Sequence, residues 1–124
     1  MSDAYDLGRA GEEAAARYLT FHDYRLLDRN WRFEHAEIDL IAEAFGLLII
    51  VEVKTRATAA YGDGLESVDA DKQRLLVRAA DAYIRKHGLH LPVRFDVITV
   101  IGRQAPFCIT HYRDAFLPPA PVGY

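Results

Sequence analysis

The fold is decided by residues 37–56, which read Glu37-Ile-Asp39-Leu-Ile-Ala-Glu-Ala-Phe-Gly46-Leu-Leu-Ile-Ile-Val-Glu52-Val-Lys54-Thr-Arg56. Acidic residues and one lysine interrupt two apolar runs here, and both runs are rich in β-branched and aliphatic residues. Because Phe45-Gly46 lies between the runs, the sequence predicts an antiparallel hairpin. We expect residues 44–47 to form a four-residue loop.

The register of this hairpin decides where its charged side chains lie. Side chains alternate between the two faces of a strand, so this loop places Asp39 opposite Glu52. Glu37 and Lys54 then face each other on the same side. A slip by one residue would put Asp39 and Glu52 on opposite faces. In the expected register the two carboxylates have Cβ atoms only ~5 Å apart and repel each other unless positive charge lies between them.

A divalent cation would relieve this repulsion. Mg²⁺ takes oxygen ligands and is commonly held by one or two carboxylates together with waters and substrate phosphate oxygens. Asp39 and Glu52 are therefore candidate ligands for Mg²⁺ or Mn²⁺, and Lys54 is placed to stabilise charge on a phosphorane or to help generate hydroxide. The alternative interpretation is an ion-pair network in which Lys54 neutralises Glu37 and Glu52 on a half-exposed face.

A family resemblance runs through most of the chain. Asp39, a spacer and Glu52-x-Lys54 resemble the PD-(D/E)xK signature of the restriction-endonuclease-like superfamily. The chain is also similar to the small bacterial YraN-like family of predicted endonuclease-fold proteins, and the matching segments are Gly8-x-x-Gly11-Glu12, Tyr18-Leu19, Arg29-Asn30-Trp31-Arg32, Glu37-Ile-Asp39-Leu-Ile-Ala42, Val51-Glu-Val-Lys-Thr-Arg56, Tyr61-Gly62, Glu66-Ser-Val68, Lys72-Gln73, Arg94-Phe-Asp-Val97 and Ala115-Phe116. One departure is Ala36, where the family usually has glycine.

The fold class expected from the order of elements is α/β (α+β), with a mixed β-sheet flanked by helices. This agrees with the restriction-endonuclease-like core that the resemblance implies. We therefore expect a Mg²⁺-dependent nuclease that acts on DNA, including branched or junction DNA. Asp39, Glu52 and the Val53 carbonyl would hold the metal, Lys54 would act on the water, and Glu37 would tune Lys54.

A first helix is predicted over residues 4–21. Gly8 and Gly11 are small enough to let this helix approach a sheet closely. Its packed face also carries Glu12, and a carboxylate on a packed face needs a partner. The resemblance brings Glu12 to the edge of the metal site as an additional acid. The alternative is a structural ion pair or cap.

Contacts with nucleic acid must be local, because the formal net charge is −3. The candidate contacts are Arg32, Arg56, Lys72 and Gln73. Lys72 and Gln73 fall at the start of a second helix and face inward or towards the sheet edge, although Lys72 can instead extend its amine to solvent. Trp31 is either a base-stacking residue or a half-buried aromatic with arginines over its face.

The other expected elements are a strand over residues 24–30 beside the hairpin, a helix from an Asp69 or Asp71 cap to His87, and strands over residues 93–101 and 107–112. The last two strands are strongly apolar, which predicts central or helix-covered positions. Cys108 is expected in the core. Asp96 is expected to have a structural role, paired with Arg94 or another group.

The composition of the 124-residue chain, 51% hydrophobic, fits a single domain over residues 1–116 with an extended proline-rich tail over residues 117–124. One cysteine excludes a disulfide framework within the chain. The N-terminus is acidic and no apolar run is long enough to span a bilayer, so we expect a cytoplasmic protein without a membrane partner. The resemblance to junction-cutting enzymes allows a homodimer.

Two other functions remain compatible with the sequence. The chain could be a non-catalytic nucleic-acid-binding or adaptor module that retains the endonuclease-like fold. It could also be a protein-interaction domain, which fits the acidic pI of about 5.9 best. A protein-interaction domain would give no role to the four ionisable groups on one face of the hairpin.

Overall fold

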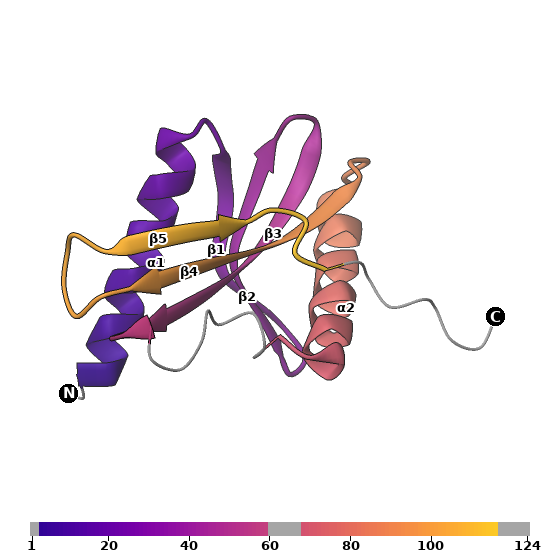
Figure 1. Cartoon of the computed structure of the whole chain (residues 1–124). Coiled ribbons are helices and arrows are strands. Elements are labelled where there is room, and N and C mark those ends of the chain that lie inside the picture. Colours follow the sequence, from indigo (N-terminus) through magenta and orange to yellow (C-terminus); the bar gives the residue numbers. More distant parts are fainter. Residues whose placement is uncertain (1–2, 60–67, 117–124) are drawn as a thin grey trace.

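The structure is a computed structural model that describes residues 3–59 and 68–116 (Figure 1). Its elements, in chain order, are α1 (Asp3–Phe21), β1 (Arg25–Phe33), β2 (Ala36–Ala44), β3 (Leu47–Arg56), α2 (Ala70–His87), β4 (Val93–Ile101) and β5 (Cys108–Tyr112). The strands form one sheet in the order β1-β2-β3-β4-β5, in which β3 and β4 are parallel and the other neighbours are antiparallel. The expected class, a mixed sheet flanked by helices, is confirmed. The predicted tail lies outside the described residues.

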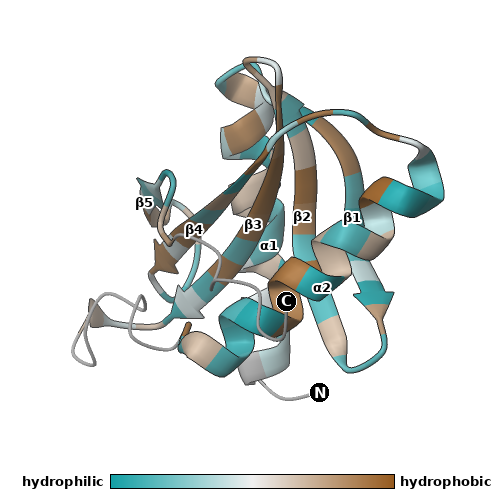
Figure 2. Cartoon of the chain, turned by 90° about the vertical axis from the view of Figure 1, so that its right-hand side faces the viewer, coloured by the Kyte–Doolittle hydropathy of each residue, from teal (hydrophilic) through white to brown (hydrophobic). Residues whose placement is uncertain are grey.

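The two helices cover opposite faces of the sheet (Figure 1). α1 packs its buried residues Ala15, Ala16 and Leu19 against one face. α2 packs Leu76 and Tyr83 against the other face. β2, β3 and β4 are hydrophobic over much of their length (Figure 2), as expected for strands covered on both sides. No helix among the described residues is long and apolar enough to cross a membrane.

The ends of α2 follow from capping. The Asp69 carboxylate accepts a hydrogen bond of 2.9 Å from the Lys72 backbone N–H, which satisfies a donor at the helix start. At the other end Gly88 adopts a left-handed conformation with φ of 61°, which ends the helix. Asp69 is therefore the cap, and Asp71 lies in the first turn. α2 also serves as the crossover connection that makes β3 and β4 parallel.

One of the two glycines in α1 allows the helix to approach β3 closely. A Cβ at Gly11 would lie 2.1 Å from Thr55 Oγ1 and 2.9 Å from Thr55 Cβ. A Cβ at Gly8 would meet nothing within 4 Å. The expected close approach is therefore confirmed at Gly11 and wrong at Gly8.

The hairpin has the expected register but a tighter turn. Glu43 pairs with Leu48, and Ala44 also pairs with Leu47, so the loop contains only Phe45-Gly46. Both turn residues have positive φ, 56° and 74°, and a turn of this kind matches the twist of the strands. The predicted four-residue loop is wrong, but the register is unchanged because each strand gains one residue.

β5 is an edge strand, not a central one. It pairs only with β4, and Cys108 at its start is exposed. The predictions of a central strand and of a core cysteine are therefore wrong. The alternative of a helix-covered strand holds on one face, where the Tyr18 hydroxyl of α1 contacts the buried His111. Apolar composition cannot distinguish the last strand of a sheet from an inner one. The predicted position of the first strand beside the hairpin is confirmed by its pairing with β2.

Asp96 of β4 is the centre of a buried polar network beneath α1. Its carboxylate accepts hydrogen bonds from Arg94 (Nε, 2.9 Å; Nη2, 2.7 Å), from His111 Nε2 (2.7 Å) and from the Asp114 backbone N–H (3.0 Å). The Tyr18 hydroxyl lies 3.1 Å from His111 Nδ1. Burial by itself would raise the pKa of Asp96, but these bonds outweigh it and lower the pKa. The expected pair with Arg94 is confirmed.

Candidate functional site

Asp39 lies at the point where β2 stops pairing with β3. The Cα pairs between these strands end at Leu40 and Val51. Next to this end, Asp39 Oδ2 accepts a hydrogen bond of 2.8 Å from the Val53 backbone N–H. Asp39 is only 8% exposed. The end of the ladder therefore holds one carboxylate in a fixed position against the neighbouring strand.

Glu52 brings the second carboxylate to the same place and has a lysine near each oxygen. Its Oε1 lies 3.9 Å from Lys54 Nζ, and its Oε2 lies 3.5 Å from Lys72 Nζ. Lys54 comes from the same strand, whereas Lys72 comes from the first turn of α2. Glu52 is 5% exposed, and its Oε2 is buried without a hydrogen-bond partner among the described residues. Such an oxygen is costly unless another group binds it.

Burial and the neighbouring Glu52 disfavour the charged form of Asp39. The pKa of Asp39 is raised to about 8, chiefly by burial and also by the neighbouring Glu52, while the Val53 N–H acts in the opposite direction. The charge of Glu12 contributes a smaller increase. A carboxyl pair of this kind requires either a proton or a cation to be stable.

The donor set fits a hard divalent cation and not zinc. Among residues 3–59 and 68–116, no group of at least three His, Cys, Asp and Glu side chains is arranged to hold a metal ion. Structural zinc sites need four such ligands, whereas Mg²⁺ keeps several waters and uses one or two carboxylates. Asp39 and Glu52 meet the second requirement, and the unbonded Glu52 oxygen supplies a free ligand atom.

Glu12 is close enough to influence Asp39 but is bonded elsewhere. Its Oε1 accepts a hydrogen bond of 2.9 Å from the Asn30 side-chain amide. The close approach of α1 at Gly11 brings this part of the helix to the sheet. The sequence interpretation gave Asn30 no role. Asn30 has a φ of 50°, a conformation that asparagine tolerates better than most residues, so an asparagine inside a predicted strand is the only sequence signal that pointed to it.

Glu37 does not pair with Lys54 as expected. Its Oε2 accepts a hydrogen bond of 2.9 Å from Arg32 Nε on β1. The reason is that strict alternation fails along β2, since Ile38 and Ile41 both pack in the cluster on the α2 side. Residues that precede the end of the ladder therefore do not keep the facing positions that a regular strand would give them.

The four candidate nucleic-acid contacts are not gathered in one place. Lys72 lies at Glu52, and Arg32 lies beside Glu37 with 80% of its side chain exposed. Gln73 donates its side-chain amide to the Val68 carbonyl at 3.0 Å. Arg56 donates to the adjacent Thr55 carbonyl at 3.1 Å. The binding role of each of these side chains stays a prediction.

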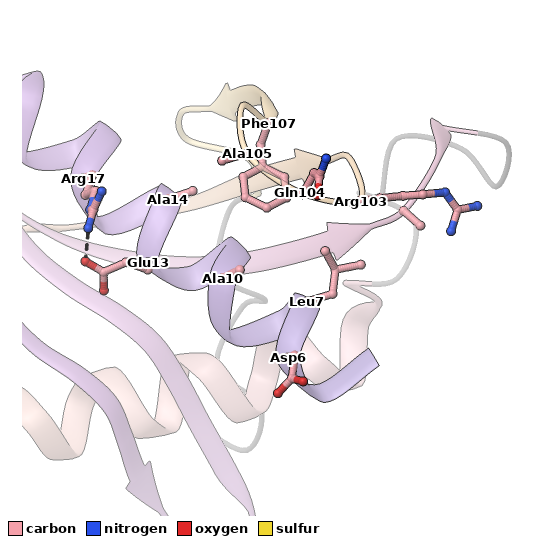
Figure 3. A pocket seen from close by; sticks show the side chains of 11 residues that line it. Asp6, Leu7, Ala10, Glu13, Ala14, Arg17, Arg103, Gln104, Ala105 and Phe107 are labelled. Carbon is pink, nitrogen blue, oxygen red and sulfur yellow. Dashed lines mark hydrogen bonds and ion pairs between the residues drawn. The ribbon is translucent and has the colours of Figure 1, made fainter. Parts of the chain in front are cut away.

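Two grooves flank α1, and neither is lined by Asp39, Glu52 or Lys54. The larger groove, of about 720 Å³, is mostly apolar and lies between α1 and the turn that leads into β5 (Figure 3). The second, of about 590 Å³, is polar, and we call it the arginine groove; its lining is Tyr5, Arg9, Glu12, Glu13, Arg29, Asn30, Arg32 and Glu37. The volume of a groove therefore does not identify the candidate metal site. The arginine groove is nevertheless connected to that site, because Glu12 lines the groove and also influences Asp39.

Comparison with known proteins gives the chain a family. The model of a family described as "Uncharacterised protein family UPF0102" matches residues 11–100, a range that includes every candidate metal ligand. The chain belongs to the UPF0102 family. The resemblance to YraN-like proteins is thereby confirmed. UPF0102 proteins of Bacteroides thetaiotaomicron and Bacteroides fragilis are 47% and 50% identical to it, and each comparison covers 96% of this chain and 98% of the relative. A UPF0102 protein of Phocaeicola vulgatus is 42% identical over the same shares of the two chains.

Proposed function

We propose that this UPF0102 protein is a metal-dependent nuclease that hydrolyses phosphodiester bonds in DNA, with Mg²⁺ or Mn²⁺ held by Asp39 and Glu52. The observation that carries the proposal is the buried carboxylate pair. Both acids are less than one-tenth exposed, Glu52 raises the pKa of Asp39, and a Glu52 oxygen has no hydrogen-bond donor among the described residues. Asp39, Glu52 and Lys54 also resemble the PD-(D/E)xK signature of the restriction-endonuclease-like superfamily. This resemblance is a second line of support for the proposal.

Asp39, Glu52 and Val53 are the proposed metal ligands. When bound, the divalent ion supplies Lewis-acid activation of the phosphate and an activated water. Asp39 has one oxygen fixed by the Val53 N–H and keeps the other for the ion. Glu52 offers its unbonded oxygen, and the Val53 carbonyl is the third candidate ligand.

Lys54 is the residue placed for charge stabilisation. It follows Glu52 by two residues on β3, and its side chain is 16% exposed, so its amine is held near the carboxylates. An ammonium in this position orients a water and stabilises negative charge that develops on the phosphate. Glu12, held by Asn30, adds negative charge that favours a cation at Asp39.

DNA is the proposed partner, and the arginine groove is the proposed approach to the site. Two of its three arginines are paired with acids, Arg29 with Glu13 at 2.8 Å and Arg32 with Glu37 at 2.9 Å. Binding of a phosphate backbone must therefore exchange these partners, and Glu37 serves to position Arg32. The resemblance to the restriction-endonuclease-like superfamily leads us to propose DNA, including branched or junction DNA, as the substrate and allows a homodimer.

The test is cleavage by purified protein on a panel of junction, flap, duplex and single-stranded DNA, with an RNA arm, in Mg²⁺ and in EDTA. We expect Mg²⁺-dependent cleavage by the wild type and its loss in Asp39→Asn and Lys54→Met. Asp71→Asn, an exposed acid of α2, is the matched control and keeps activity. Absence of cleavage in every arm, together with metal-independent binding of DNA, would support a non-catalytic adaptor and reject the enzyme.

A further inference from the structure

Lys72 occupies an unusual place for a surface lysine. It stands in the first turn of α2, where the Asp69 cap holds its backbone, and its Nζ reaches to 3.5 Å from Glu52 Oε2. That oxygen is buried and has no hydrogen-bond donor among the described residues. The ammonium of Lys72 therefore places a positive charge near this oxygen without donating a hydrogen bond to it.

The charges around Glu52 suggest why the contact exists. Two ammonium groups lie at Glu52, Lys54 at 3.9 Å from one carboxylate oxygen and Lys72 at 3.5 Å from the other. Buried charges need such partners, and removal of one partner leaves the other uncompensated. Until a metal ion binds, a positive charge beside Glu52 compensates this buried carboxylate.

We propose that Lys72 provides this charge, as an internal counter-ion that occupies Glu52 Oε2 and moves away when a divalent cation binds there. The inference rests on the proposed function, because it concerns the same carboxylate. A metal ion on Oε2 and an ammonium 3.5 Å from that atom repel each other strongly in a site that excludes water. One of them must leave.

Lys72 is better placed to leave than Lys54. Its side chain is 37% exposed, compared with 16% for Lys54, and its four-carbon stem can swing to solvent without any change in α2. Lys54 projects from a strand inside the sheet. Release would present the Lys72 amine to an incoming phosphate only after the metal is bound, which couples substrate binding to metal loading.

Such a device has a measurable consequence. If metal binding must displace Lys72, the lysine weakens metal binding by some factor. Removal of the lysine must then strengthen metal binding by that factor, because coupling between two ligands of one site is reciprocal. Calorimetric titration with Mn²⁺ of the metal-free protein should show Lys72→Met binding about fivefold or more tightly than the wild type. Lys72→Arg, which keeps the charge, should not bind more tightly.

The matched control is Lys86→Met, an exposed lysine in the last turn of the same helix, which should bind Mn²⁺ like the wild type. A second readout is amine acylation followed by mass spectrometry. Mn²⁺ should increase the labelling of Lys72 relative to Lys86. Equal or weaker metal binding by Lys72→Met, or unchanged labelling of Lys72, would overturn the inference. A wild type without Asp39-dependent Mn²⁺ binding would instead overturn the proposed function itself.

Discussion

Replacement of Asp39 by asparagine should make the metal-free protein more stable, and by more at high pH than at low pH. The pKa of Asp39 is raised from 3.8 to about 8, first by burial and then by Glu52. A folded-state pKa above the unfolded value means that the neutral form is favoured in the fold. The corresponding stability is fully present below pH 3.8 and is lost as pH rises through about 8.

The magnitude follows from the size of the shift. Each pKa unit corresponds to about 1.4 kcal/mol, so a shift from 3.8 to about 8 sets a ceiling of roughly 6 kcal/mol. Asparagine keeps an oxygen that can accept from the Val53 N–H and carries no charge next to Glu52. After relaxation of the site we expect Asp39→Asn to be more stable than the wild type by about 2–4 kcal/mol at pH 9.

The assay is urea unfolding in EDTA at pH 5 and pH 9. The difference between Asp39→Asn and the wild type should be larger at pH 9. Asp71→Asn, whose acid is 90% exposed, is the control and should show no comparable change with pH. A variant that is less stable than the wild type at pH 9 would refute the reasoning, because the carboxylate would then be stabilising in its charged form.

Two other perturbations test the fold around the site. Gly11→Ala should destabilise the protein by ~1–3 kcal/mol, because its Cβ would overlap the Thr55 side chain. Gly8→Ala, where the space is open, should instead stabilise the protein by ~0.5–1 kcal/mol. Equal effects of the two substitutions in thermal unfolding would contradict the close approach of α1 to β3 at Gly11. Asp96→Asn should lower stability at pH 7 by about 3 kcal/mol, because it leaves the Arg94 charge buried without its partner. The pKa of Asp96 is lowered, so the loss should shrink as pH falls below 3.8; a loss that does not change with pH would show that the carboxylate charge is not responsible.

Local signals in the sequence predicted the elements and the central pair of the site. An aspartate cap at position 69 or 71 and Gly88 marked the ends of α2, with Asp69 the cap in the structure, and the apolar run in residues 93–101 matched β4. Period-two patterning on either side of Phe45-Gly46 predicted the register that brings Asp39 and Glu52 together, although the predicted loop was too long. These features depend on interactions between near neighbours, which the sequence displays directly.

The errors and omissions involve contacts between distant segments. The Glu37–Lys54 pair was wrong because β2 loses strict alternation near its end of the ladder. The bond from Asn30 to Glu12 and the approach of Lys72 to Glu52 join separate elements. Patterning predicts the face of a residue only where a strand stays regular, and it does not predict which side chains from other elements contact that residue.

The central claim is that Asp39 and Glu52 together bind a divalent cation. The most direct measurement is anomalous X-ray diffraction from crystals of the protein grown or soaked in Mn²⁺. We predict one manganese peak bound by carboxylate oxygens of both residues, with the Lys72 amine displaced from Glu52. A well-ordered site without manganese, in which Lys72 still lies against Glu52 at saturating Mn²⁺, would contradict the account.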